Sequence, residues 1–184
     1  MIQVHLADTE TDLIGIKKLQ LANLSSQLST AEKESEGFVT CEYSVDDLKV
    51  MNSPYPHVVA TWEDEVVGYC LVMLKEHCDI MPVLKPMFDL ISELDVDEVA
   101  LSELSHFTMG QVCIAKSHRG AGVFYKMYDH LRANMSGQFD LVITEISANN
   151  TRSLQAHEKQ GFKVLKEYVA PDGLPWVMVY WDWR

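Results

Sequence analysis

The sequence has few of the features that mark secreted, membrane-spanning or metal-binding proteins. Its four cysteines show no CxxC spacing, and no Cys and His residues stand at the short spacings typical of zinc sites. The first residues carry neither a basic leader nor an apolar run. No stretch approaches the roughly 20 apolar residues that cross a bilayer. We therefore expect a cytoplasmic protein with reduced thiols, no metal and no membrane association.

Positive charge is also scarce, with 15 Lys and Arg against 27 Asp and Glu and a formal net charge of −12. Proteins that bind the phosphate backbone of nucleic acid need a basic surface, so the composition argues against nucleic acid as a partner. A negative cleft could attract a cationic amine, although the usual effect of such charge is solubility.

The apolar periodicity predicts one mixed α/β domain over residues 1–184, a length that can bury a full core. In the first half we expect the following elements: a strand at 2–6, a helix capped by Asp8 or Thr9 with Leu13, Ile14, Leu21 and Leu24 on its apolar side, a polar loop at 25–36, a helix with Ser44 as N-cap and Asp47 in a capping box, and a hairpin of strands 57–62 and 66–74.

Residues 76–106 are less regular. They contain a predicted helix that begins near Pro82 and Pro86 and extends through Leu94, followed by an acidic loop. The segment is too short to carry its own core, so we interpret it as an insertion in the domain.

The second half alternates strands and helices. The expected elements are a strand at 109–115, a glycine-bearing turn at 116–122, a helix at 123–135, a strand at 139–147, a helix at 150–160 that Gly161 ends, and closing strands at 162–169 and 176–183.

The turn at 116–122 has the features of an anion site. Gly120 and Gly122 let the main chain approach a ligand, and the next helix presents free amides and the positive end of its dipole. Lys116 and Arg119 add positive charge. The pattern predicts a phosphate or pyrophosphate ligand, and a tight turn with no ligand would give the same pattern.

A nucleotide-binding regulator is a weaker interpretation of this turn. The turn does not match the G-x-G-x-x-G motif of dinucleotide-binding loops, because Tyr125 occupies the position of the last glycine. The Lys-Ser/Thr ending of a Walker loop is missing too.

Two longer runs, QVCIAKSHRGAGVFYKMYDHL and VITEISANNTRSLQAHEKQGF, resemble the GNAT superfamily of N-acetyltransferases. The Q/R-x-x-G-x-G/A loop of that family holds the coenzyme A pyrophosphate. Arg119 and Gly122 match it, and Phe124 replaces the final small residue. The second run supplies Asn150, Ser153, His157, Gly161 and Phe162 at the family's offsets, with His157 where a Tyr is common.

The resemblance implies which residues contact the cofactor. Strand 112–114 would offer main-chain groups to the pantetheine arm, and the loop would hold the pyrophosphate. The implied cofactor-binding residues are Val112, Cys113, Ile114, His118, Arg119, Gly120, Ala121, Gly122, Val123, Phe124, Asn150 and Ser153.

Catalytic roles follow from the same resemblance. In the family, the residue at the position of His157 protonates the coenzyme A thiolate; a His could act there as acid or base, or only line the pocket. Glu145 is twelve residues earlier, at the offset of a Glu proposed as base in ribosomal-protein alanine acetyltransferases; a structural carboxylate is the alternative interpretation. His106 is a reserve base. Cys113 is interpreted as a packing residue, because direct attack needs no protein nucleophile.

The resemblance therefore implies a GNAT-type acyl-CoA N-acyltransferase fold, a mixed and mainly antiparallel sheet flanked by helices and splayed between the fourth and fifth strands. The implied activity is transfer of an acetyl group from acetyl-CoA, as co-substrate, to a primary amine of a small molecule or peptide in a ternary complex. The insertion at 76–106 would lie near the acceptor site. A non-catalytic acyl-CoA-binding or sensing module on the same fold remains an alternative. A homodimer is compatible with this fold.

Overall fold

The structure, a computed structural model, describes residues 1–27 and 38–184 and divides into two compact units. The first unit comprises Met1–Val72 and Gly110–Ala133, and the second comprises Met73–Met109 and Asn134–Arg184. Strand β6 (His106–Ile114) begins in the second unit and ends in the first. Most of the loop predicted at 25–36 lies outside the described residues.

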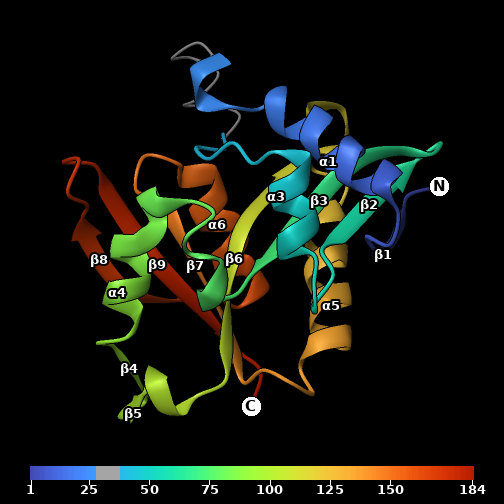
Figure 1. The fold of residues 1–184 in the computed structure, drawn as a ribbon. Coiled ribbons are helices and arrows are strands. Elements are labelled where there is room, and N and C mark those ends of the chain that lie inside the picture. Colours follow the sequence, from blue (N-terminus) through green and yellow to red (C-terminus); the bar gives the residue numbers. More distant parts are fainter. Residues whose placement is uncertain (28–37) are drawn as a thin grey trace. The chain divides into compact units, whose positions relative to one another are not determined.

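The first unit contains strands in the order β1-β2-β3-β6 (Figure 1). Its other elements are β1 (Gln3–Leu6), β2 (Val58–Trp62), β3 (Glu65–Met73), α1 (Glu10–Leu21), α3 (Val45–Met51), α5 (Val123–Met135) and short 3-10 turns at Ser25–Gln27 and Lys116–His118. β2 pairs antiparallel with both β1 and β3, which confirms the predicted hairpin.

Helix α1 differs from its prediction in the face that it buries. Thr9 caps it as predicted, with Thr9 and Asp12 forming a reciprocal capping box. Ile14, however, is 54% exposed, whereas Gln20 is fully buried. Gln20 takes an interior position because its amide donates to Oε1 of Gln111 at 3.0 Å. Because this polar residue is paired in the core, the buried face of α1 differs from the face that its apolar residues alone predicted.

The second unit contains strands in the order β6-β7-β9-β8. Its elements are α4 (Lys85–Ile91), β4 (Asp95–Val96), β5 (Val99–Ala100), β7 (Leu141–Ser147), α6 (Thr151–Gln160), β8 (Lys163–Val169), β9 (Pro175–Asp182) and 3-10 turns at Lys75–His77, Pro82–Leu84 and Leu101–Glu103. β9 pairs antiparallel with β7 and β8.

Two predictions in this unit are wrong. The acidic segment after α4 is not a loop, because β4 and β5 form a small antiparallel hairpin. Its turn residues Asp97 and Glu98 adopt positive φ angles of 52° and 68°, which Asp tolerates better than most residues. Strand β6 also begins three residues earlier than predicted, so that His106 is its first residue.

The parallel pairing of β6 with β7 is short. The register covers three residue pairs, from His106 opposite Leu141 to Thr108 opposite Ile143. Both strands continue beyond this point, β6 to Ile114 and β7 to Ser147. The mixed, mainly antiparallel sheet flanked by helices, with this short parallel pairing, confirms the predicted fold class.

Gly161 gives a test of the local structure that ends α6. It adopts φ 105°, and a Cβ there would lie 3.2 Å from Nε1 of Trp181. We expect Gly161→Ala to lower the unfolding free energy by about 1–2 kcal/mol, because L-residues are strained in this region and Trp181 must shift. Urea denaturation measures the change. Gly137→Ala, at a glycine whose added Cβ meets no described atom, is the control, and equal losses in both variants would contradict the assignment.

Candidate functional site

The loop between β6 and α5 has an open, curved main chain. Arg119 is extended, and Gly120 and Gly122 adopt φ angles of 77° and 75°. Among the described residues, no atom lies within 4 Å of a Cβ built at either glycine. Alternating backbone handedness of this kind turns successive amides toward one side and forms a concave anion site. The loop therefore has the geometry that a phosphate group requires.

The first turn of α5 continues this surface. Its first helical hydrogen bond runs from the amide of Lys126 to the oxygen of Gly122 at 3.2 Å, so the amides of residues 123–125 precede the helical ladder. Phe124, the bulky departure from the family pattern, packs its ring on Tyr128 at 4.7 Å between centroids. Since Tyr128 lies one turn further along α5, the ring is accommodated by the helix that carries it.

Arg119 supports the loop with its side chain. Its Nε donates to the oxygen of Ile114 at 3.0 Å, and its Nη2 donates to Oδ1 of Asn23 at 2.7 Å. The guanidinium thereby ties the loop to the end of β6 and to the segment after α1. Its neighbour His118 contacts the Ser117 hydroxyl at 2.9 Å, and its ring lies tilted against that of Trp62, with 5.9 Å between the centroids. Both predicted residues therefore have a part in the shape of the loop.

Cys113 is a packing residue in β6. It is 7% exposed, and burial raises the pKa of its thiol to about 12. The thiol is protonated at neutral pH and is a poor nucleophile. Val112 and Ile114, on either side of it, are half-buried.

In the second unit, Glu145 of β7 accepts a hydrogen bond from the hydroxyl of Tyr168 in β8. Burial raises the pKa of Glu145, and the bond from Tyr168 partly offsets the rise. Burial and the contact with the carboxylate also raise the pKa of Tyr168. A carboxylate with a raised pKa and a fixed donor is the arrangement expected of a general base. Tyr168 was not among the site residues predicted from the sequence.

His157 lies in the core on α6. It is 1% exposed, its Nδ1 donates to the oxygen of Ser153 at 2.8 Å, and its ring packs edge-on against Phe162. Burial lowers its pKa to about 4, so it is neutral at pH 7. The geometry therefore disfavours the role of a cationic acid, which stays a prediction.

Glu145 and the surroundings of His157 lie on opposite faces of the sheet. Paired residues in neighbouring strands share a face, and successive residues alternate. Glu145 is three positions from Val142, which is opposite Trp181. The ring of Trp181 contacts Phe162, the residue that packs on His157. A direct proton relay between the two predicted catalytic residues is therefore not present in this unit.

Asn150 and Ser153 build the beginning of α6. Oδ1 of Asn150 accepts from the amide of Ser153 at 3.2 Å, which makes Asn150 the N-cap. Asn150 is 8% exposed. These two predicted cofactor residues therefore have a clear structural role, and their contact with a cofactor stays a prediction.

The burial of His157 predicts a pH-dependent stability. Because its folded pKa of about 4 lies below the ordinary value near 6.5, its contribution is complete above pH 6.5 and is lost as the pH falls toward 4. The loss is on the order of 3 kcal/mol. Denaturation of the wild type and of His157→Phe at pH 7 and pH 4.5 measures it. The variant should show the smaller drop, and equal drops would contradict the buried, neutral state.

Among residues 1–27 and 38–184, no group of three or more His, Cys, Asp and Glu side chains is arranged to hold a metal ion. The helices in this described part of the chain are also too short or too polar to cross a membrane.

Comparison with solved structures shows the same fold in several acetyltransferases. The Escherichia coli ribosomal-protein-S18-alanine N-acetyltransferase has a TM-score of 0.63 at 12% identity, over 99% of this chain and 94% of that one. The NatC complex bound to Gag peptide and CoA gives 0.66 at 15% identity, over 98% of each chain. The putative acetyltransferase yncA of Salmonella typhimurium, solved with acetyl-CoA, gives 0.63 at 14% identity, over 100% and 95%.

A comparison with curated protein sequences found no match. The model of the acetyltransferase (GNAT) family, however, matches residues 21–162, which include both the loop before α5 and all of α6. This match covers well over half of the sequence. The chain belongs to the GNAT family of acetyltransferases.

Proposed function

We propose that this protein is an acetyl-CoA-dependent N-acetyltransferase that acts on a primary amine by direct attack in a ternary complex. The observation that carries the proposal is the pair of open, positive-φ glycines, Gly120 and Gly122, directly before α5 in a member of the GNAT family. A main chain of this shape presents its amides to an anion of the size of a pyrophosphate.

The residues of the first unit suit coenzyme A. The amides of residues 120–125 would hold the pyrophosphate, and Arg119 would keep the loop in shape through Ile114 and Asn23. The main chain of residues 112–114 would lie along the pantetheine arm. The thioester itself supplies the activated acetyl group.

Glu145 is our proposed base. Transfer requires that the attacking amine lose a proton and that coenzyme A leave as a thiol, so one proton moves in total. A carboxylate whose pKa burial has raised takes up a proton more readily than a solvated one. The hydroxyl of Tyr168 would hold Glu145 in one orientation. His157 would chiefly support α6, since a neutral, buried imidazole has no proton to give from the nitrogen opposite Nδ1.

The acceptor class is an amine of a small molecule or peptide. Two of the similar structures are an enzyme named for ribosomal-protein alanine and a complex with a bound peptide, so a peptide N-terminus is one arm of the test. Polyamines, amino acids and aminoglycosides are the other amine acceptors to be tested. A panel of these amines, with release of free thiol from acetyl-CoA as the readout, tests the proposal.

A non-catalytic acyl-CoA-binding module is the second candidate. The burial and lowered pKa of His157 favour it, because a neutral imidazole whose Nδ1 is held by the oxygen of Ser153 is poorly suited to the acid role that this position commonly has in the family. Calorimetry with coenzyme A, ATP and NAD separates the cases. Binding of coenzyme A alone with thiol release supports the enzyme. Binding of coenzyme A without thiol release with any amine supports the module. If none of the three ligands binds, both the enzyme and the module are contradicted.

A further inference from the structure

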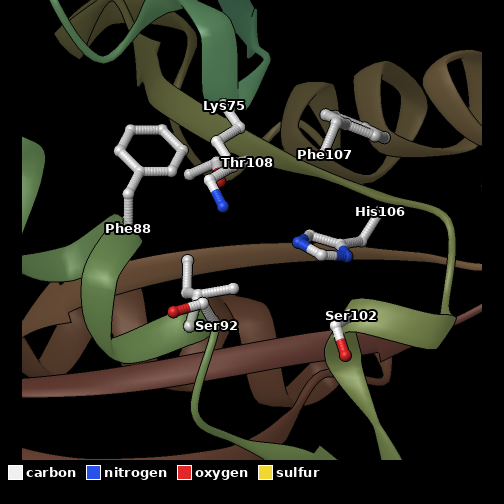
Figure 2. A pocket seen from close by; sticks show the side chains of 8 residues that line it. Lys75, Phe88, Ser92, Ser102, His106, Phe107 and Thr108 are labelled. Atoms are coloured by element: carbon white, nitrogen blue, oxygen red, sulfur yellow. The ribbon is translucent and has the colours of Figure 1, made fainter.

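The second unit contains a cavity of about 70 Å³ between the 76–106 insertion and the first residues of β6. Its lining residues are Lys75, Phe88, Ile91, Ser92, Ser102, His106, Phe107 and Thr108. Figure 2 shows Lys75 and His106 pointing into it from different elements, with Phe88 of α4 on the opposite wall. Because all eight residues belong to one unit, the cavity is a property of that unit alone.

Lys75, an exposed residue, brings a positive charge to the lining of the cavity. Lys17, Lys18 and Lys85 each form an ion pair with a carboxylate. The exposed side chain of Lys75 forms no such ion pair among the described residues, as is also true of Lys49 and Lys159, but it is the lysine that lines the cavity. Figure 2 shows it directed toward the middle of the cavity. An anionic ligand would complete this site.

Thr108 adds a hydroxyl to the lining of the cavity. It is 2% exposed and lines the cavity, and within the described part of the chain its Oγ1 has no hydrogen-bond partner. Ser102, on the exposed rim, presents a second hydroxyl without a partner among the described residues. Both groups can donate to the anion that Lys75 attracts.

His106 has a fixed tautomer. Its Nδ1 lies 2.9 Å from the oxygen of Leu104, which can only accept, so Nδ1 carries the proton of the neutral ring. Nε2 is therefore an acceptor, and Figure 2 shows a ring nitrogen on the side of the cavity.

Apolar side chains complete the wall. Phe88 and Ile91 are 6% and 3% exposed and come from α4. A cavity with apolar walls and a few convergent polar groups is typical of small-molecule sites. The cavity offers one cation, hydroxyl donors and an apolar wall, which together fit a carboxylate on a short hydrocarbon chain.

The cavity also shares a face of the sheet with the proposed base. His106 and Thr108 are opposite Leu141 and Ile143, so all four side chains lie on one face. Glu145 is the next residue of β7 on that face, about 7 Å further along the strand. A ligand anchored in the cavity by its carboxylate would reach Glu145 only with a nitrogen several carbons away.

We propose that this cavity binds the carboxylate end of the acceptor, and that the acceptor is an ω-amino carboxylate. The second half of this proposal, the identity of the acceptor, rests on the acetyltransferase function proposed above. The carboxylate pairs with Lys75 and the hydroxyls of Thr108 and Ser102, the methylene chain covers Phe88 and Ile91, and the amine extends along the sheet to Glu145.

Binding is tested without catalysis by calorimetry with pentanoate and with its neutral amide, pentanamide. Pentanoate should bind at least about tenfold more tightly than the amide, because one charged hydrogen bond is lost with the charge. Lys75→Met should remove that preference, and Ser102→Trp, on the exposed rim, should block both probes. Lys85→Met changes an exposed lysine of α4 that is paired with Asp89, and it should bind as the wild type does.

Turnover is tested with 5-aminopentanoate against 5-aminopentanamide. The wild type should prefer the carboxylate by about tenfold in kcat/KM, chiefly through KM, and Lys75→Met should lose the preference. Equal binding of pentanoate and pentanamide would overturn the cavity as a carboxylate site, even if other amines are acetylated. Carboxylate binding without turnover of any amine would overturn the acceptor role and would also count against the proposed function.

Discussion

Replacement of Glu145 by Gln is expected to lower kcat for acetyl transfer by at least about 100-fold, with little change in the affinity for coenzyme A. The variant keeps the size of the side chain and an oxygen that accepts from Tyr168, but it cannot take a proton from the amine. General bases contribute about 10²–10⁴-fold to enzymatic rates. Steady-state thiol release measures kcat, and calorimetry measures cofactor binding.

The matched control is Glu167→Gln. Glu167 precedes Tyr168 in β8, is exposed, and loses the same charge. It should keep nearly wild-type kcat. Comparable losses in both variants would show that the overall negative charge, and not a base at position 145, determines the rate.

Tyr168→Phe gives a second readout that a purely structural role would not change. The hydrogen bond from Tyr168 lowers the pKa of Glu145, so its removal should raise that pKa further. The base is active only when deprotonated, and the acid limb of the kcat/KM profile should therefore move to higher pH. An unmoved limb would exclude Glu145 as the group that the profile reports.

The sequence predicted those elements whose limits are set by local chemistry. Helix α5 has the predicted bounds because Gly122 ends the turn before it. Helix α6 lies between Asn150, which caps it, and Gly161, whose positive φ ends it. Capping residues act within one turn of the chain and can therefore be recognised from spacing alone. The glycine loop was predictable for the same reason.

The contact between Glu145 and Tyr168 was not predictable in this way. The two residues are separated by 23 positions, and β9, which follows both in sequence, lies between their strands. Tyr168 shares the face of Glu145 only because it is opposite Trp176, which in turn is opposite Ser147. No local pattern fixes such a register. The period of β8 indicates only that Tyr168 alternates with exposed neighbours.

Burial was equally hard to predict where a polar residue has an interior partner. Gln20 occupies the buried side of α1 because Gln111, 91 positions away, supplies its hydrogen bond. His157 is buried because the oxygen of Ser153 and the ring of Phe162 satisfy it. The partner of Gln20 is distant in sequence, and the partners of His157 are near it, but in neither case does the apolar periodicity show that a polar side chain is paired in the core.

Gly120→Ala is expected to weaken coenzyme A binding by about tenfold or more. The glycine adopts φ 77°, where an L-residue is strained by about 1–2 kcal/mol, so the loop should relax and turn its amides away from the pyrophosphate. A Cβ at this position meets no described atom within 4 Å, so a clash inside the protein is not the cause. Calorimetry with coenzyme A measures the loss.

The ligand can be divided to locate the effect. A pantetheine thioester without the pyrophosphate should bind the wild type and Gly120→Ala alike, because only the pyrophosphate uses the loop amides. Gly137→Ala, at a glycine with equal free space and no positive φ, should leave both affinities unchanged. If Gly120→Ala weakened both ligands equally, or neither, the loop would not be the pyrophosphate site. The family fold would then remain, but the cofactor would have to be held by other groups, because the amides at the beginning of α5 would not be directed at an anion.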